Sequence, residues 1–262
     1  MSMPLFSKKL ITPEEALSRG REIARTLELL YGGPAVIRML EIPVENLFST
    51  EPFFERTKLG LVLRAILLEN YQAPIAVLNE SNRFLLIDGH HRAYVYWLTG
   101  KKYVHAVIIR VTTLTYNTQR KTWKFWEMRL FNDKIPDNPL ERLWRFMAGV
   151  IHFYTKEYKG IFRLRLEYTP LDKLIPTQPF VEFDRIIGVK KNRLIEEPIL
   201  CLEKNGRKYI LDGHARSLIL FEQGAARIKA LILYPIENIS KLGIEEVVEK
   251  MGLQTLADVS II

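Results

Sequence analysis

Apolar residues occur along the chain in short runs separated by polar turns, a pattern that predicts alternating strands and helices. The apolar run Ile75–Leu78 is followed by the polar segment NESN and a second run, Phe84–Ile87, as expected for two strands joined by a turn. The sequence DGHHR (88–92) then leads into an apolar segment of helical length ending at Gly100, a residue type common just after helix ends. A third strand is predicted at His105–Arg110. Together these elements predict an α/β unit.

The same pattern occurs twice. EIPVENLFSTE (41–51) matches YTPLDKLIPTQ (168–178), and residues 73–92 match residues 197–216 once a gap of three residues is allowed. The matched positions include Pro43 with Pro170, Thr50 with Thr177, Asp88 with Asp212, Gly89 with Gly213, His90 with His214, Arg92 with Arg216 and Gly100 with Gly224. Agreement at a constant offset is the signature of an internal repeat. The chain is therefore predicted to contain two tandem copies of one α/β (α+β) unit.

Three further helices are predicted from apolar residues at helical spacing. They are residues 13–31, which follow Thr12 as a helix-capping residue, residues 58–70, and residues 138–158. We expect the first and the last to lie outside the repeat. The predicted domains are 1–112 (N-terminal helix and a catalytic first copy), 113–165 (a helical connector that packs the copies together) and 166–262 (a degenerate second copy).

Composition places the chain among globular proteins without membrane segments. Of its 262 residues, 48% are hydrophobic and 26% are charged, which excludes a disordered chain. No stretch approaches the roughly 20 apolar residues of a membrane span, and the first residues lack a secretory signal, so we expect a cytoplasmic protein. The single cysteine, Cys201, excludes an internal disulfide and a cysteine-based metal site.

The net charge of +8 favours an anionic partner, either nucleic acid or a nucleotide or phosphorylated metabolite. The densest basic cluster is Arg120, Lys121 and Lys124, with Trp123 and Trp126 between them. This mixture suits single-stranded nucleic acid, and it equally suits a solvated face over buried tryptophans. Charge alone leaves the partner open.

The DGHHR segment has the chemistry of a phosphate site. Gly89 permits a sharp turn in which backbone N–H groups approach a ligand closely, and the next residues begin a helix whose free N–H groups favour an anion. Arg92 can contact phosphate oxygens in a bidentate manner, beside His90 and His91. Asp88 would repel phosphate unless it holds a cation such as Mg²⁺ or orients the histidines. The alternative is an ordinary turn with polar surface histidines.

The strand, DGHHR, helix and strand of both copies resemble the ParB/sulfiredoxin superfamily over about 140 residues. Sulfiredoxins carry a catalytic cysteine in this loop, where His90 and His214 stand here, which excludes that branch. ParB proteins continue with a GERR-type box and a helix-turn-helix domain, neither of which follows His105–Arg110 here. The first copy is most similar to archaeal free L-serine kinases.

This resemblance implies an enzyme that phosphorylates L-serine to O-phosphoserine with ATP or ADP and Mg²⁺, a step of cysteine biosynthesis. It implies that Glu51 is the catalytic base. Asp88 would act in catalysis as a metal ligand, and Gly89, His90, His91 and Arg92 would bind the nucleotide phosphates. Thr50 and Arg56 are further candidates for contact with phosphate or substrate.

The second copy lacks two of these groups, since Gln178 replaces Glu51 and Ala215 replaces His91. An amide cannot act as a base, so the first copy is predicted to be the working one; drift at two exposed positions is the alternative. Two other functions stay open at this point. One is a ParB-like nucleic-acid-binding or regulatory protein, and the other is a kinase of a different small hydroxylated metabolite.

Overall fold

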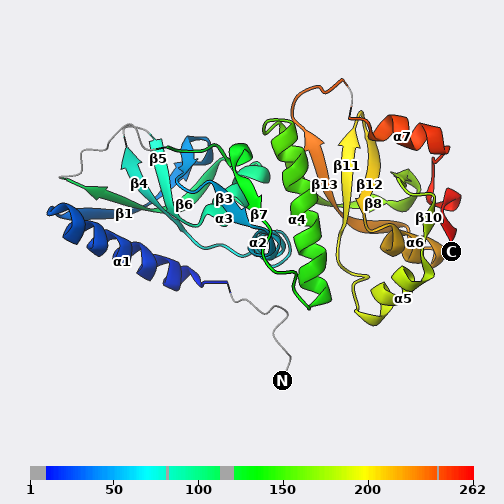
Figure 1. Cartoon of the computed structure of the whole chain (residues 1–262), viewed down its shortest axis with the longest axis horizontal. Helices are drawn as coiled ribbons and strands as arrows, with labels where there is room; N and C mark the ends of the chain where they lie inside the picture. The colour runs from blue at the N-terminus through cyan, green and yellow to red at the C-terminus, as the bar shows by residue number, and fades with distance from the viewer. Residues whose placement is uncertain (1–9, 81–82, 113–120, 241) are drawn as a thin grey trace. The chain divides into compact units, whose positions relative to one another are not determined.

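The computed structural model describes residues 10–80, 83–112, 121–240 and 242–262. The chain divides into two compact units, residues 1–160 and residues 161–262. Within the described residues each unit contains one five-stranded sheet, and the two sheets have the same topology (Figure 1). This is the mixed α/β fold in two repeated units that the sequence predicts.

The sheet of the first unit consists of β1 (Ala35–Pro43), β2 (Leu47–Ser49), β4 (Ile75–Glu80), β5 (Arg83–Asp88) and β6 (Tyr103–Val111). Their order is β1–β6–β4–β5–β2. β6 is antiparallel to β1 and parallel to β4, while β5 is antiparallel to β4 and parallel to β2. The three strands predicted around DGHHR are therefore β4, β5 and β6.

The sheet of the second unit repeats this arrangement, including a shift in strand register. It consists of β8 (Phe162–Pro170), β9 (Leu174–Ile175), β11 (Ile199–Lys204), β12 (Arg207–Asp212) and β13 (Arg227–Pro235). Their order is β8–β13–β11–β12–β9. The β4–β5 register shifts between Ala76 and Val77, and the β11–β12 register shifts at the matched positions, Leu200 and Cys201. Such bulges are inherited features of a fold.

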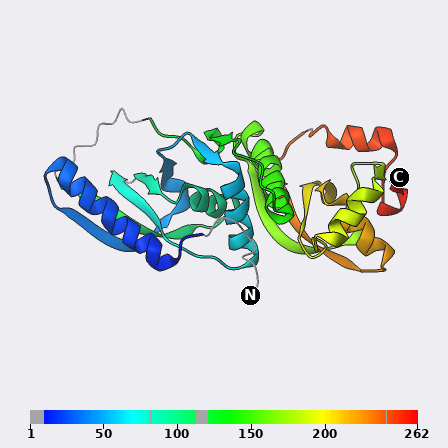
Figure 2. The same cartoon turned by 60° about the horizontal axis from the view of Figure 1, so that its bottom comes forward.

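Helix α1 (Pro13–Tyr31) forms as predicted and lies along the first sheet (Figures 1 and 2). Thr12 and Glu15 form a reciprocal capping box at its start, which satisfies N–H groups that the helix itself cannot. At the position of Gly20, a Cβ atom would lie 2.8 Å from Cγ1 of Val107 on β6. A larger residue would push the helix away, so Gly20 sets how closely α1 approaches the sheet.

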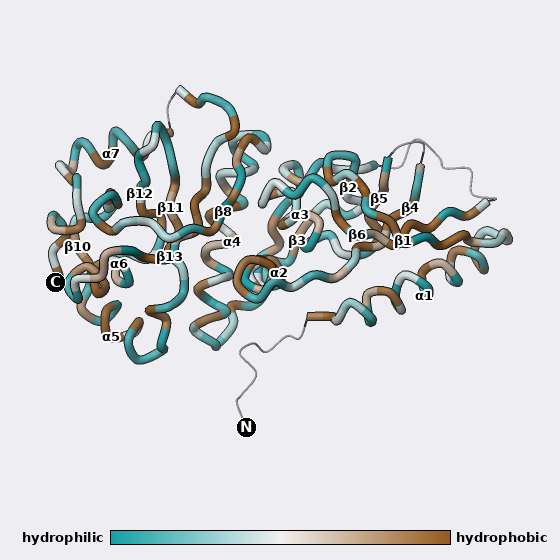
Figure 3. Tube along the Cα trace, turned by 180° about the vertical axis from the view of Figure 1, so that it is seen from behind, coloured by the Kyte–Doolittle hydropathy of each residue, from teal (hydrophilic) through white to brown (hydrophobic). Residues whose placement is uncertain are grey.

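Helix α2 (Arg56–Leu68) packs against α4 (Pro139–Glu157), the helix predicted at 138–158. The α2 sequence is mostly apolar and appears largely brown in Figure 3, as expected for a helix buried on most sides. Gly60 faces the backbone of Trp144, whose side chain is fully buried. Both helices belong to the first unit.

The repeat extends further than the sequence match. In the first unit β3 (Phe53–Glu55) pairs in parallel with β7 (Arg129–Phe131), and in the second β10 (Phe180–Val181) pairs in parallel with β14 (Ser260–Ile261). A short 3₁₀ turn precedes each of the later strands. The backbone N–H of Lys124 donates to Glu127, and that of Thr255 donates to Asp258, at 2.7 Å in each case. The prediction that all of 113–165 lies outside the repeat is therefore wrong for residues 124–131, which correspond to 255–262.

Helices α1 and α4 also occupy the same place in the order of elements. Each has 19 residues, begins with a proline and precedes the first strand of a sheet. They differ in packing, because α1 covers its own sheet whereas α4 packs on α2. The remaining helices are α3 (His90–Leu98), α5 (Phe183–Lys191), α6 (His214–Glu222) and α7 (Ile244–Met251).

Candidate functional site

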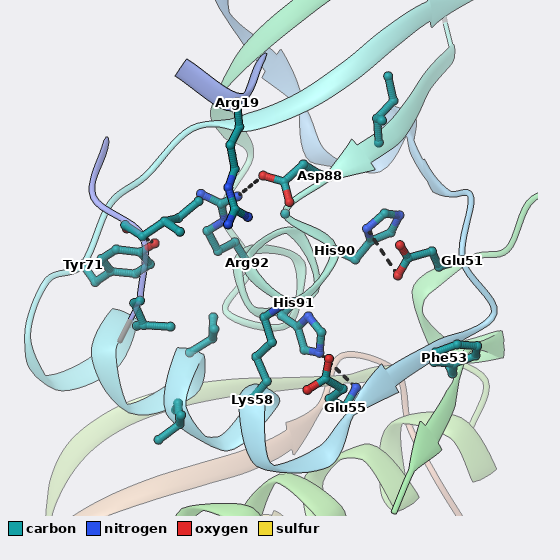
Figure 4. Close-up of a pocket in the computed structure, with 16 residues that line it drawn as sticks. Arg19, Glu51, Phe53, Glu55, Lys58, Tyr71, Asp88, His90, His91 and Arg92 are labelled. Carbon is teal, nitrogen blue, oxygen red and sulfur yellow. Dashed lines mark hydrogen bonds and ion pairs between the residues drawn. The ribbon is translucent and has the colours of Figure 1, made fainter. Parts of the chain in front are cut away.

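A pocket of about 530 Å³ lies in the first unit where β5 gives way to α3 (Figure 4). Its walls come from α1, β3, α2, β5 and α3 and from segments that connect these elements. The polar and aromatic lining residues are Arg19, Glu51, Phe53, Glu55, Lys58, Tyr71, Asp88, His90, His91 and Arg92. Glu51 and the whole DGHHR segment, which are far apart in sequence, thus share one cavity.

The turn between β5 and α3 depends on Gly89. Its φ of 90° lies in the left-handed region, and a Cβ there would lie 2.8 Å from Cγ2 of Ile75. Within the described part of the chain no side chain caps the N-terminus of α3, so the N–H groups of its first turn are available to an anion. Gly213 repeats this geometry, with φ of 102° and the same contact to Ile199.

Glu51 and His90 face each other in this pocket. The distance from Oε2 of Glu51 to Nδ1 of His90 is 3.7 Å; the histidine side chain is 5% exposed and the carboxylate side chain 52%. Burial lowers the pKa of His90, while the negative charges of Glu51 and Asp88 act in the opposite direction. A solvent-accessible carboxylate beside a buried, mostly neutral imidazole is able to accept a proton from a substrate hydroxyl.

Asp88 and Arg92 form an ion pair one helical turn apart. Nη2 of Arg92 donates to Oδ2 of Asp88 at 3.0 Å. The Arg92 side chain is 5% exposed, and its Nη1 atom is buried with no hydrogen-bond partner among the described residues. Because an unsatisfied buried guanidinium nitrogen is costly, this atom marks a place where a bound anion would be stabilised.

His91, which the sequence predicts to bind phosphate, is engaged by the protein itself. Its Nε2 accepts a hydrogen bond from the backbone N–H of Glu55 at 3.0 Å, and its ring contacts that of Phe54, with 5.4 Å between centroids. Burial lowers the pKa of His91 to about 3. The ring is therefore neutral, with its proton on Nδ1, and it ties α3 to the start of α2.

Thr50 and Arg56 do not line the pocket. The Thr50 hydroxyl donates to the carbonyl of Leu86 at 2.5 Å and lies 3.4 Å from Nε2 of His90. Thr50 therefore contacts the ring nitrogen of His90 that does not face Glu51. Nε of Arg56 donates to the carbonyl of Arg145 on α4 at 3.1 Å. Its guanidinium fills the space left by Gly149, which takes it away from the DGHHR loop.

Five of the polar and aromatic pocket residues were not among the predicted site residues: Arg19, Phe53, Glu55, Lys58 and Tyr71. The positive charge of Lys58, in the first turn of α2, contributes to lowering the pKa of both His90 and His91. Lys58 stands only seven residues after Glu51 in the sequence, so a basic residue near the candidate base could have been considered for the site. Nothing in the local sequence pointed to Arg19, which lies in a helix with no counterpart in the matched segments.

The second copy keeps the scaffold of the site but not all of its side chains. Nη2 of Arg216 donates to Oδ2 of Asp212 at 2.7 Å, as in the first copy. Nε2 of His214 accepts the backbone N–H of Thr177 at 3.0 Å, and burial lowers the pKa of His214 to about 4. An exposed Gln178 stands where the first copy has its carboxylate, so no base faces His214 at that position.

The pocket suits Mg²⁺ only as a partner of bound phosphates. Among the described residues no group of three or more His, Cys, Asp or Glu side chains could hold a metal ion. One oxygen of Asp88 is engaged by Arg92, which leaves the other oxygen and the Glu51 carboxylate. One or two carboxylates with substrate phosphates are a usual environment of Mg²⁺, so the residues present fit the ion in that manner.

The basic and aromatic cluster packs on the protein itself. Nζ of Lys124 lies 4.0 Å from the ring centroid of Phe48. The ring centroids of Trp126 and Trp97 are 5.8 Å apart. Nζ of Lys121 lies 5.6 Å from the ring of Trp123. Arg120 lies outside the described residues. These aromatic faces are engaged internally, which leaves less of them for stacking on bases.

No described helix is both long enough and apolar enough to cross a membrane.

No known family profile matches the sequence. The uncharacterised protein MJ0188 of Methanocaldococcus jannaschii is 37% identical over 116 residues, which are 41% of this chain and 43% of that protein. The match therefore spans less than half the length of this relative.

Two solved structures match parts of this chain at low similarity. Protein Atu1540 from Agrobacterium tumefaciens matches 34% of this chain and 50% of its own, with 22% identity and a TM-score of 0.27. A free serine kinase mutant in complex with AMP matches 82% of this chain and 73% of its own, with 12% identity and a TM-score of 0.25. Similarity at this level does not establish a shared function.

Proposed function

We propose that the pocket of the first unit transfers a phosphoryl group from ATP or ADP to the hydroxyl of a small metabolite, with free L-serine as the acceptor. The observation that carries this proposal is the position of the Glu51 carboxylate, 3.7 Å from His90 at the first turn of α3. A base and an anion-binding helix end within one cavity are what hydroxyl phosphorylation needs. Serine itself rests on the sequence resemblance of the DGHHR region.

In the proposed reaction the serine oxygen forms a bond to the terminal phosphorus of the nucleotide. The bond from that phosphorus to the bridging oxygen breaks, and ADP or AMP leaves with the electron pair. The hydroxyl proton passes to the carboxylate of Glu51. Because Glu51 is half exposed, it can release this proton to water after each turnover.

Charge on the transferred group is balanced by groups that surround the β5–α3 turn. The N–H groups of the first turn of α3 and the ammonium of Lys58 are placed to do this, and both belong to the pocket. Preorganised donors and cations of this kind supply much of the rate of phosphoryl transfer. Mg²⁺ brought by the nucleotide, with Asp88 as a candidate ligand, would neutralise further phosphate charge.

His90 has a supporting role in this scheme. Its buried ring stays largely uncharged because burial lowers its pKa, so it does not neutralise the Glu51 carboxylate. Thr50 lies 3.4 Å from its other nitrogen. The ring is thus fixed on both sides and keeps the base next to the helix end.

The test is phosphate transfer from ATP or ADP with Mg²⁺ to a panel of amino acids and polyols, scored by product formation. We expect serine-dependent consumption of nucleotide and formation of O-phosphoserine. In Glu51→Gln turnover should fall by about 10²-fold or more, the usual scale for loss of a general base. Glu45→Gln, at an exposed carboxylate that does not line the pocket, is the matched control.

Two results would overturn the proposal. One is near-normal serine phosphorylation by Glu51→Gln. The other is the absence of phosphate transfer to every acceptor in the panel by a protein that binds the nucleotide. Transfer to a polyol in preference to serine would keep the reaction class and replace the acceptor.

A further inference from the structure

Two arginine side chains, Arg19 and Arg92, line the same pocket. Figure 4 shows Arg19, Asp88 and Arg92 grouped together, with Glu51 and His90 on the other side. Arg19 comes from α1 and Arg92 from α3, so the two cations belong to elements far apart in the sequence. Like charges repel unless an anion lies near both.

Asp88 does not balance both charges. Its Oδ2 is bonded to Nη2 of Arg92, and within the described ranges no carboxylate forms an ion pair with Arg19. Two guanidinium groups and one carboxylate leave this side of the pocket with a net positive charge. The group is therefore complementary to an additional anion.

The orientation of Arg92 points to the same conclusion. Its side chain is 95% buried, yet Nη1 has no hydrogen-bond partner in the described structure. Tyr71 lies beside it: its hydroxyl donates to the carbonyl of Ile11 at 2.8 Å and is also hydrogen-bonded to the Arg92 side chain. The remaining Nη1 is a buried donor without an acceptor in a side chain that lines the cavity, and an anion would satisfy it.

The matched arginine of the second copy is engaged differently. Nη2 of Arg216 donates both to Asp212 and to the carbonyl of Pro198, and its Nε is buried without a hydrogen-bond partner in the described chain. Each copy thus has one unpartnered guanidinium nitrogen, Nη1 in Arg92 and Nε in Arg216. What distinguishes the first copy is Arg19, which also lines the cavity.

Arg19 is held in place by the packing of α1. The helix starts with the Thr12–Glu15 capping box, and the neighbouring Gly20 brings it against Val107. This packing fixes the position of the Arg19 backbone, from which the exposed side chain reaches the pocket.

We propose that Arg19 and Arg92 form a second anion subsite that binds a phosphate of the donor nucleotide other than the one transferred. This inference rests on the proposed function for the identity of its ligand. The transferred phosphate lies near Glu51 and the first turn of α3, whereas the arginine pair takes the phosphate on the leaving group. Arginine suits this role because its fork of N–H donors matches two phosphate oxygens.

The test measures binding without an acceptor, by titration calorimetry with inorganic pyrophosphate, ADP and adenosine. We expect Arg19→Gln to weaken the binding of pyrophosphate and of ADP at least tenfold and to leave the binding of adenosine unchanged. Its binding should also depend less on salt, since one phosphate contact is lost. Arg25→Gln removes an exposed arginine from the same helix that does not line the pocket, and we expect it to bind all three like the unchanged protein.

The outcomes separate this inference from the proposed function. If Arg19→Gln binds pyrophosphate and ADP as tightly as the unchanged protein does, the subsite is wrong, whether or not serine is phosphorylated. If the unchanged protein binds neither pyrophosphate nor ADP, the subsite is also wrong. If binding depends on Arg19 while no acceptor is phosphorylated, the anion subsite stands and the kinase function fails.

Discussion

The backbone N–H of Glu55 donates to Nε2 of His91, with 3.0 Å between the two nitrogens. This bond joins the first turn of α3 to the residue that precedes α2. It gives His91 a positioning role, because Lys58 extends from the first turn of α2 into the same pocket (Figure 4). In the second copy Ala215 cannot make this bond, and Gln178 stands there in place of Glu51.

Loss of this bond should be visible in stability. We expect His91→Ala to lower the free energy of unfolding by about 1–3 kcal/mol, the usual penalty for a buried donor left without an acceptor. Urea denaturation followed by circular dichroism measures the change. His105→Ala is the control, since that side chain is 62% exposed and its loss should have little effect. Equal stability of the two variants would show that the bond to Glu55 contributes nothing.

The buried histidines predict how stability depends on pH. Burial lowers the pKa of His91 to about 3 and those of His152 and His214 to about 4, from an ordinary value of 6.5. Below pH 6.5 the unfolded chain binds protons that the folded chain does not, so unfolding becomes easier as the pH falls. Each group contributes up to about 1.4 kcal/mol per pH unit.

We therefore expect a lower urea midpoint at pH 5 than at pH 7. In the variant His152→Gln this pH dependence should be smaller, because one of the buried histidines no longer titrates. A midpoint that stays constant between these pH values would mean that the histidines are accessible to protons in the folded protein.

The turn at Gly89 predicts a contrast between two glycines. At Gly89 a Cβ would lie 2.8 Å from Ile75 and 2.9 Å from Nη2 of Arg92, whereas at Gly100, with φ of 71°, it would meet nothing within 4 Å. We expect Gly100→Ala to cost about 1 kcal/mol from its left-handed backbone alone. Gly89→Ala should cost more and lower the melting temperature further, because steric overlap adds to backbone strain. Equal melting temperatures would contradict the close approach seen at Gly89.

The two copies predict different consequences of losing matched histidines. His90→Ala removes the ring next to Glu51 and should reduce turnover by about 10²-fold, the scale seen when one preorganised group is lost. His214→Ala should leave serine phosphorylation near that of the unchanged protein once folded protein is compared. Steady-state kinetics with serine as the varied substrate measures both. A similar loss in the two variants would mean that the second copy takes part in the reaction.

Much of the fold could be predicted because it depends on local patterns. Helix α1 has the predicted bounds Pro13–Tyr31, since its capping residues are adjacent in sequence. The strands β4, β5 and β6 follow from apolar runs between turn residues. The correspondence of 124–131 with 255–262 could not be predicted, because the two segments share no identical residue in that register. It becomes visible only through the strands with which β7 and β14 pair.

The sequence by itself determined the duplication, the glycine turn into α3 and the difference between Glu51 and Gln178. Each of these depends only on which residue types occur at a fixed spacing along the chain. Only the tertiary structure decided which side chains share the pocket. It brought Arg19 and Lys58 in and turned Arg56 toward α4. The direction of a long side chain depends on the space and the hydrogen-bond acceptors that distant segments provide, and these exist only once helices and sheet have packed.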